Sequence, residues 1–343
     1  KLRISSFNKY LITFIGLLFL YIFYLLIPLL YDKNWIQNNI ESKILNEFKI
    51  NVSTSADISY RILPAPHFLI KNSKILLDGI KTQKSTVNVK TLKVFLSQEN
   101  FFNKEKLFLK KIIIDNANFY LLKNELKMIN DFNNNSFSNK KIKIKNSNIF
   151  FKDNLNEIIT IVKINKAILF FDNDTKLNLF NLKGNVFGVP FIFDLRSKND
   201  SIIKKKINIE SKLLKLNIFN ESIIKNDNSN TGKNIILFLK SRFKTKYEVK
   251  KKLITFASNN SQLNSSKINY NGVLSINPFD LDLNIDLGNY KISQLFSFNS
   301  LLKEFFESGI LFNERLSLDV SILARTDGQD QIFQNAKINL NIV

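Results

Sequence analysis

The sequence has 343 residues, of which 45% are hydrophobic, and 50 Lys and Arg stand against 29 Asp and Glu to give a formal net charge of +21. That apolar share is too high for a disordered tail. Because the sequence contains no cysteine, it excludes disulfide frameworks, thiolate chemistry, Cys-ligated zinc and iron–sulfur clusters. Its single histidine also excludes a two-histidine metal site.

The basic charge comes almost entirely from lysine, since only 6 of the 50 basic residues are arginine. Arginine is the side chain suited to bidentate recognition of phosphates and bases. Lysine, asparagine, isoleucine and phenylalanine are also the residues that an AT-rich genome encodes most readily. No nucleic-acid-binding motif accompanies the charge. We therefore expect no nucleic-acid partner.

Residues 10–31 form an uncharged apolar run of 22 residues. As a helix it would be about 33 Å long, enough to cross a bilayer. The alternative is a cleaved signal peptide, but the run is long and lacks an Ala-x-Ala cleavage site. Because Lys1, Arg3 and Lys9 precede it, we expect residues 1–9 to be cytoplasmic and the rest to be translocated, as a single-pass protein.

Apolar residues recur at helical spacing over 32–48, beginning near Trp35. This pattern predicts a short amphipathic helix just beyond the anchor. Two positions for it remain open: against the membrane surface, or as a cover over one end of a sheet.

After Ile50 the period of the apolar residues changes to two, as in half-buried strands. Because the helical segments that parallel crossovers need are missing, we expect a mainly β, antiparallel, strand-after-strand sheet over 49–343. The predicted strands lie near 52–62, 68–77, 87–96, 107–114, 117–122, 142–144, 158–163, 167–172, 177–182, 191–196, 205–210, 235–240, 245–257, 267–276, 281–287, 316–322 and 338–342.

A loose repeat of the form x-Asn-[Ser/Ala]-x-apolar interrupts the alternation. It occurs four times, around Asn72, Asn116, Asn146 and Asn335. Such a pair suits a bend or turn that feeds a strand. Its uneven spacing is unlike a solenoid or propeller, and chance recurrence in an Asn-rich chain is the competing explanation.

Three segments depart from the strand pattern. Residues 130–140 and 225–234 are polar and Asn-rich, which predicts loops. Residues 293–308 carry apolar side chains at three- and four-residue spacing, which predicts a helix. The alternating run that reaches Val343 leads us to expect that the domain continues beyond this point.

No catalytic motif accompanies these elements. Glycine-rich phosphate loops, GxSxG and HExxH are all missing from the sequence. The acidic residues Asp282 and Asp286 are better explained as the polar side of a strand than as a metal site. His67 has no partner motif, so a structural role is expected. We predict no enzymatic activity, no catalytic residue, no metal and no cofactor.

Segment 58–68, ISYRILPAPHF, resembles the N-terminal signature of the AsmA family. The order of features is similar too: a transmembrane helix, a short helix from Trp35, a strand, a turn formed by Leu63, Pro64, Pro66 and His67, and another strand. The resemblance is specific over about 10–80. One departure is Phe48-Lys49-Ile50, where family members often have Leu-Gly.

The resemblance implies a bacterial inner-membrane protein whose periplasmic sheet curls into a long hydrophobic groove, similar to chorein-type bridge-like lipid carriers. It implies phospholipid binding or movement toward the outer membrane, and it carries over no catalytic residue. The alternative function is a membrane-tethered factor that regulates outer-membrane protein assembly, with outer-membrane assembly components as partners and a closed β-sandwich. The apolar positions that would face lipid in a groove are Ile142, Ile144, Leu281, Leu283, Ile285, Leu287, Leu316, Leu318, Val320 and Ile322.

Overall fold

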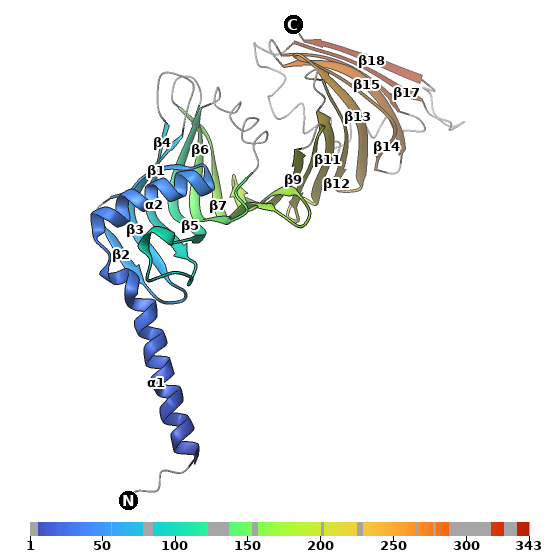
Figure 1. Cartoon of the computed structure of the whole chain (residues 1–343). Coiled ribbons are helices and arrows are strands. Elements are labelled where there is room, and N and C mark those ends of the chain that lie inside the picture. Colours follow the sequence, from blue (N-terminus) through green and yellow to red (C-terminus); the bar gives the residue numbers. More distant parts are fainter. Residues whose placement is uncertain are drawn as a thin grey trace, which may run out of the picture. The chain divides into compact units, whose positions relative to one another are not determined.

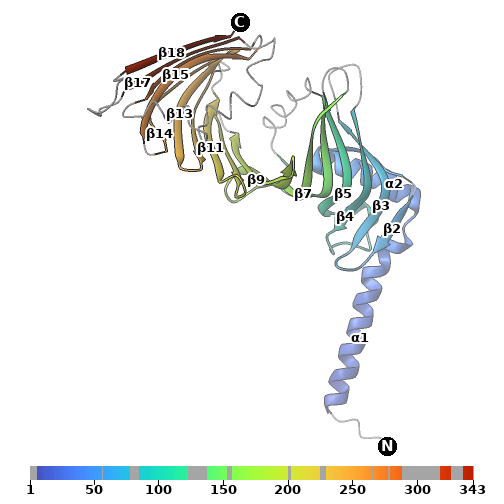
Figure 2. The same ribbon diagram turned by 180° about the vertical axis from the view of Figure 1, so that it is seen from behind.

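The computed structural model of the chain is mainly β, with one long apolar helix at its N-terminus (Figures 1 and 2). It describes residues 6–55, 57–77, 85–122, 137–152, 157–199, 202–224, 229–264, 266–276, 279–287, 317–325 and 335–342. The chain forms two compact units, Lys1–Gly188 and Val189–Val343. The predicted fold class, a curled and unclosed sheet with few helices, is confirmed.

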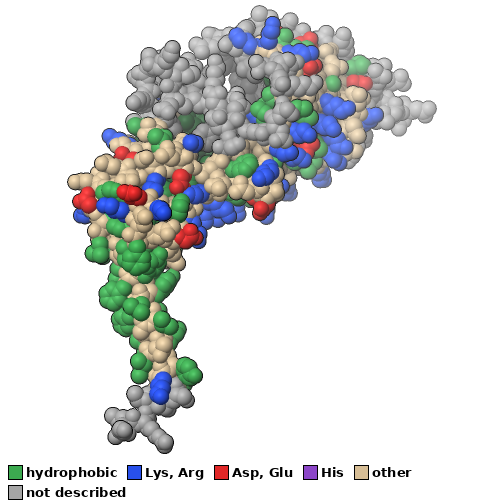
Figure 3. All heavy atoms as spheres, in the orientation of Figure 1, with side chains coloured by type: hydrophobic (Ala, Val, Ile, Leu, Met, Phe, Trp, Pro, Cys, Tyr) green, Lys and Arg blue, Asp and Glu red, His purple; other side chains and the backbone are tan. Residues whose placement is uncertain are grey.

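Helix α1 (Ser6–Leu26) continues into a 3₁₀ turn, η1 (Ile27–Leu30), which has Pro28 in its first turn. Proline lacks the N–H that a continuing α-helix needs, so the change of helix type at this point is expected. Residues Phe7–Leu30 are long and apolar enough to cross a membrane. Their side chains are mostly exposed, and the space-filling view shows apolar side chains along the helix (Figure 3). The segment therefore begins three residues before the predicted span of 10–31 and ends one residue before the end of that span.

Helix α2 (Lys33–Phe48) packs on the sheet of the first unit, which is one of the two positions expected from the sequence (Figure 1). The Asp32 side chain caps it by accepting a hydrogen bond from the Trp35 N–H at 2.9 Å. Its buried face consists of Ile36, Ile40, Ile44 and Phe48. At its C-terminus Lys49 adopts a left-handed conformation, which is the position where glycine is usual.

The first unit holds strands β1 to β8 and the short 3₁₀ turn η2 (Lys104–Lys106). Each strand pairs with the next in antiparallel fashion from β2 to β8, except that β5 and β6 are parallel, and β1 shares the edge of β3 with β2. The strands are β1 (Asn51–Ser53), β2 (Ile58–Arg61), β3 (His67–Leu77), β4 (Ser85–Leu96), β5 (Leu109–Leu122), β6 (Lys141–Lys152), β7 (Ile158–Asp172) and β8 (Leu177–Val186).

The second unit is built from sequentially paired strands that are antiparallel except for β16 and β17. Among its described strands the first, β9, and the last, β18, do not pair with each other. The strands are β9 (Val189–Asn199), β10 (Ile203–Ser211), β11 (Leu216–Ile224), β12 (Asn230–Phe238), β13 (Ser241–Lys250), β14 (Leu253–Leu263), β15 (Ser266–Ile276), β16 (Phe279–Leu287), β17 (Ser317–Arg325) and β18 (Asn335–Ile342).

Several predicted boundaries are wrong. The strand predicted at 245–257 is a hairpin that turns at Lys251, and the loop predicted at 225–234 gives its last five residues to β12. Strand β11 was not predicted, because its run LNIFNESII breaks the alternation with Asn and Ser on the apolar side. The predicted helix at 293–308 and residues 130–136 of the predicted loop lie outside the described residues.

The Asn repeat marks irregularities inside long strands rather than turns before them. Asn72, Asn116 and Asn146 all have left-handed backbones, with φ of 52°, 55° and 46°. Each lies at a point where the pairing with the neighbouring strand skips a position. Asparagine tolerates this conformation better than other residues with a side chain. The two strands predicted at 107–114 and 117–122 are accordingly one strand, β5, interrupted at Asn116.

At each of these positions the alternation of buried and exposed residues changes phase. In β3, for example, Ile70 is buried, Lys71 and Asn72 are exposed, and Ser73 is buried again. The β5 and β6 irregularities are joined by two hydrogen bonds: the Ser147 hydroxyl accepts from the Ala117 N–H at 3.0 Å, and the Asn146 side-chain amide donates to Asp115 at 3.0 Å. The fourth copy differs, since Asn335 opens strand β18 as the sequence predicted.

We expect Asn116→Val to lower the free energy of unfolding of the first unit by about 1–2 kcal/mol, because a β-branched residue is strained at φ 55°. Trp35, the single tryptophan, lies in this unit and gives a fluorescence signal for denaturant unfolding of the detergent-solubilised chain. Asn116→Gly is the control and should cost less than the valine variant. Equal losses for the two variants would contradict a conformational cause.

Candidate functional site

In the first unit, the face of the sheet that α2 covers is packed with the protein's own side chains. Ile142 is 3% exposed and belongs to the core beneath α2, and Ile144 packs against the same core. The structure therefore places these two candidate positions in or beside a packed core. The remaining candidates lie in the second unit.

The turn at 63–67 is a packed structural corner. Leu63 is exposed, the Leu63–Pro64 peptide bond is cis, and Pro66 and His67 are buried. The Pro66 carbonyl accepts a hydrogen bond from the Leu96 N–H at 3.0 Å, which ties the turn to the end of β4. This arrangement fits the structural role expected of His67.

The imidazole of His67 is 3% exposed and stacks on Phe95 with ring centroids 4.8 Å apart. Its Nδ1 lies 2.7 Å from the Ala65 carbonyl oxygen, to which a neutral ring donates. Burial lowers the pKa of His67, and the nearby charges of Lys93 and Arg61 lower it further, while the bond to Ala65 acts in the opposite direction. The folded protein therefore favours the uncharged ring.

The second unit has two chemically different faces, which the strand register separates. We call one of them the inner face. Its positions alternate with exposed lysines on the same strands, and their side chains are buried or half-buried where they are described. It comprises residues 193–199 odd of β9, 203–211 odd of β10, 216–224 even of β11, 230–238 even of β12, 241–249 odd of β13, 254, 256, 258, 261 and 263 of β14, 266–276 even of β15, 279–287 odd of β16, 318–324 even of β17 and 336–342 even of β18.

The opposite, outer face is charged and exposed. Lys204, Lys233, Lys246 and Lys250 are exposed there, and Figure 3 shows basic side chains gathered over this part of the surface. The outer face also carries the ion pair between Lys206 and Glu221, at 2.7 Å.

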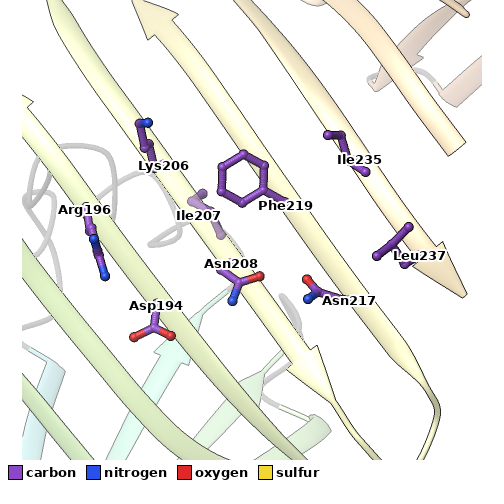
Figure 4. Close-up of a pocket in the computed structure, with 9 residues that line it drawn as sticks. All are labelled: Asp194, Arg196, Lys206, Ile207, Asn208, Asn217, Phe219, Ile235 and Leu237. Carbon is purple, nitrogen blue, oxygen red and sulfur yellow. The ribbon is translucent and has the colours of Figure 1, made fainter. Parts of the chain in front are cut away.

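A hollow of about 460 Å³ lies on the outer face across β9 to β12. Figure 4 shows its mixed lining, with charged and amide side chains beside four apolar ones. The residues are Asp194, Arg196, Lys206, Ile207, Asn208, Asn217, Phe219, Ile235 and Leu237. Of the charged residues in this lining, Lys206 is already paired with Glu221.

On strands β15 to β18 every inner-face position except Ser266 is apolar, a tyrosine or a glycine. The parallel register of β16 and β17 aligns Leu281 with Leu318, Leu283 with Val320, and Ile285 with Ile322. Leu281, Leu283 and Ile285 are partly exposed, whereas Leu287 is 2% exposed. Leu318, Val320 and Ile322 are placed by the backbone register alone, and Leu316 lies outside the described residues.

Two aromatic rings lie flat on the inner face because glycine stands opposite them. A Cβ on Gly272 would come within 2.6 Å of the Phe256 ring, and one on Gly232 would come within 2.5 Å of the Tyr247 ring. The Tyr247 hydroxyl then reaches Asn220, two strands away, at 2.9 Å. Sequence reasoning missed this pairing, because nothing in a single strand shows which residue stands across from its glycine.

A row of neutral polar side chains crosses the inner face between β11 and β15. The Thr245 and Tyr270 hydroxyls are 2.6 Å apart, and so are the Ser258 and Ser261 hydroxyls. Asn234 lies in the same row, and its Oδ1 is buried without a hydrogen-bond partner. The inner face thus combines a polar row over β11–β15 with a wholly apolar surface over β16–β18.

Lys205 is the one residue of this face that departs from neutrality. It lies on β10 between Ile203 and Ile207 and is 8% exposed, whereas Lys204 and Lys206 point to the outer face and are exposed. Burial lowers the pKa of its ammonium group. The sequence did contain the signal, since alternation from Ile203 places the middle lysine of the run IKKKI among the apolar residues.

The described residues contain no group of three or more His, Cys, Asp or Glu that could hold a metal ion. No protein-family model and no curated protein matches the chain. Function must therefore be argued from the two faces of the second unit and from the N-terminal helix.

The buried imidazole predicts a pH dependence of stability. Because the folded state depresses the pKa of His67, the unfolded chain binds more protons below the ordinary value of 6.5, so the first unit should lose stability as the pH falls through that value. The measurement is denaturant unfolding followed by Trp35 fluorescence between pH 8 and about pH 5. His67→Gln should flatten this slope, and an unchanged slope in that variant would assign the effect to other groups.

Proposed function

We propose that this protein is a membrane-anchored carrier that holds or conducts phospholipid on the inner face of its second unit. One observation carries the proposal: Leu274 of β15 and Leu281, Leu283 and Ile285 of β16 are only partly buried, in a sheet whose first and last described strands do not pair. A large unpartnered apolar surface is typical of sites that bind apolar ligands or membranes. Acyl chains are a ligand of that chemistry.

The N-terminal helix supports the same proposal. Phe7–Leu30 is long and apolar enough to insert into a bilayer, and a protein that exchanges lipid must reach one. The resemblance of segment 58–68 to the AsmA family supports the bacterial inner membrane as that bilayer. It also supports the periplasm as the location of the two units and the outer membrane as the destination of the lipid.

The contrast between the two units adds a physical reason. In the first unit α2 buries Ile36, Ile40, Ile44 and Phe48 against the sheet, so the apolar face has a protein cover. Leu283 and Ile285 in the second unit retain partial exposure. A bound lipid would remove this surface from water, at about 25 cal/mol per Å² of apolar area.

Photo-crosslinking tests the proposal in the full chain in its native membrane. A photoreactive phenylalanine analogue at Leu283 should form adducts with phospholipid, whereas the same analogue at Asn284 should not, since Asn284 is exposed on the outer face of the same strand. Mass spectrometry of the adducts identifies what is captured. Adducts with polypeptide alone at Leu283 would instead support the alternative, an assembly factor that binds unfolded outer-membrane proteins.

The substitution Leu283→Asp should reduce lipid binding while leaving membrane insertion intact. A carboxylate on the inner face removes apolar contact and repels lipid phosphates. Co-purified phospholipid per chain is the measurement, and Asn284→Asp, which adds the same charge on the outer face, is the matched control. If the inner face were instead a closed protein core, Leu283→Asp would mainly unfold the second unit, which circular dichroism detects.

A further inference from the structure

The inner face of the second unit carries one positive charge, and no described residue of that face neutralises it. Among the inner-face positions of the described strands, Lys205 is the only Lys, Arg, Asp or Glu. Its side chain makes no hydrogen bond or ion pair with any described residue. Charged groups are rarely buried without a partner, because removing an ammonium from water costs several kcal/mol.

The residues beside Lys205 are hydroxyls. The register places Ser197 of β9 and Ser222 of β11 directly across from it on either side. Both serines are buried, at 2% and 6% exposure, and the Ser197 Oγ has no hydrogen-bond partner. Directly opposed residues have Cβ atoms about 4.5–5.5 Å apart, so the three polar groups lie together. A hydroxyl donor beside an ammonium is a typical arrangement for holding an anionic oxygen.

The residues along the strand from Lys205 are apolar. Ile203 and Ile207 flank it on the same face of β10, and Leu195 lies across from Ile207 on β9. Lys205 is two residues from the end of β10, so the polar group lies near one rim of the face. Ile207 and Ile209 continue inward from it along β10, and Asn220 of the polar row lies across from Ile207 on β11. A headgroup at the rim and acyl chains further in would satisfy both surfaces.

We propose that Lys205, Ser197 and Ser222 form a seat for the phosphodiester headgroup of an anionic phospholipid. A phosphodiester carries one negative charge, which matches one ammonium, and its free oxygens can accept from both the lysine and the serine hydroxyls. A free inorganic anion would satisfy the lysine but leave Ile203 and Ile207 without apolar contact. The seat rests on the proposed function, because it assumes that lipid occupies the inner face.

Lipid binding by the full detergent-solubilised chain tests the seat. The probes are phosphatidylglycerol, phosphatidylcholine and diacylglycerol with identical acyl chains. The wild-type chain should bind phosphatidylglycerol about tenfold more tightly than diacylglycerol, the size of effect expected for one charge-assisted contact. It should bind phosphatidylcholine at an intermediate level, because that headgroup has the phosphodiester but no net charge.

Lys205→Met removes the charge and keeps the length and apolar stem of the side chain. It should lower phosphatidylglycerol affinity about tenfold while diacylglycerol binding stays within twofold, and Lys205→Arg should restore most of the loss. Lys206→Met is the matched control, since Lys206 lies one residue away on the outer face. It should leave all three affinities unchanged.

Each result separates the seat from the proposed function. Loss of headgroup preference in Lys205→Met with retained diacylglycerol binding supports both, whereas an unchanged preference for phosphatidylglycerol in Lys205→Met overturns the seat and leaves the lipid carrier standing. Absence of binding to any of the three lipids by the wild-type chain overturns the proposed function itself. Competition by free glycerol phosphate at the same concentration as the lipid would show a site for soluble anions and would also overturn the seat.

Discussion

The structure depends on one constraint, which is that a sheet with an apolar side must have that side covered. In a strand whose apolar and polar residues alternate, all the apolar side chains lie on one face of the sheet, and exposing that face to water is unfavourable. In the first unit the chain supplies the cover as α2, whose four buried residues belong to the same hydrophobic core as residues of the strands. The second unit has the same kind of strands, and the described residues include no helix over them. This difference between the units is the physical basis of the proposed function.

The composition of the inner face refines that picture. A surface that is simply buried under protein rarely contains an unpaired charge, yet Lys205 lies between two isoleucines on its own strand and between two serines on the neighbouring strands. A surface meant only for hydrocarbon has no need of the polar row of Asn220, Asn234 and Thr245. That row is neutral, and among the described inner-face positions Lys205 alone carries a charge. The outer face has the opposite chemistry, with exposed lysines that keep the sheet soluble and are compatible with anionic membrane surfaces.

Much of this architecture followed from the sequence. The apolar run from Tyr10, the helix from Trp35 and the alternating strands are local patterns, and local patterns survive folding. What failed depended on partners across the sheet. The turn at Lys251 was missed because its run Lys250-Lys251-Lys252 contains no Gly, Pro, Asn or Asp to mark a turn, and β11 was missed because Asn220 and Ser222 stand on its apolar side. The ring of Phe256 over Gly272 and the isolation of Lys205 appear only when the register is known. The Asn repeat was visible in the sequence, but its role inside the strands was not.

That repeat has a consequence for how the first sheet finds its alignment. Sliding one strand past its neighbour by two residues keeps every side chain on its proper face, so repetitive Ile and Lys sequences discriminate weakly between such alignments. The left-handed asparagines at 72, 116 and 146 stand in strands β3, β5 and β6, where the alternation changes phase. If one strand slipped by two residues, its alternation would change phase at a different level from that of its neighbours. For part of its length, lysines would then lie beside isoleucines on the same face. The three asparagines therefore favour a single register for these strands.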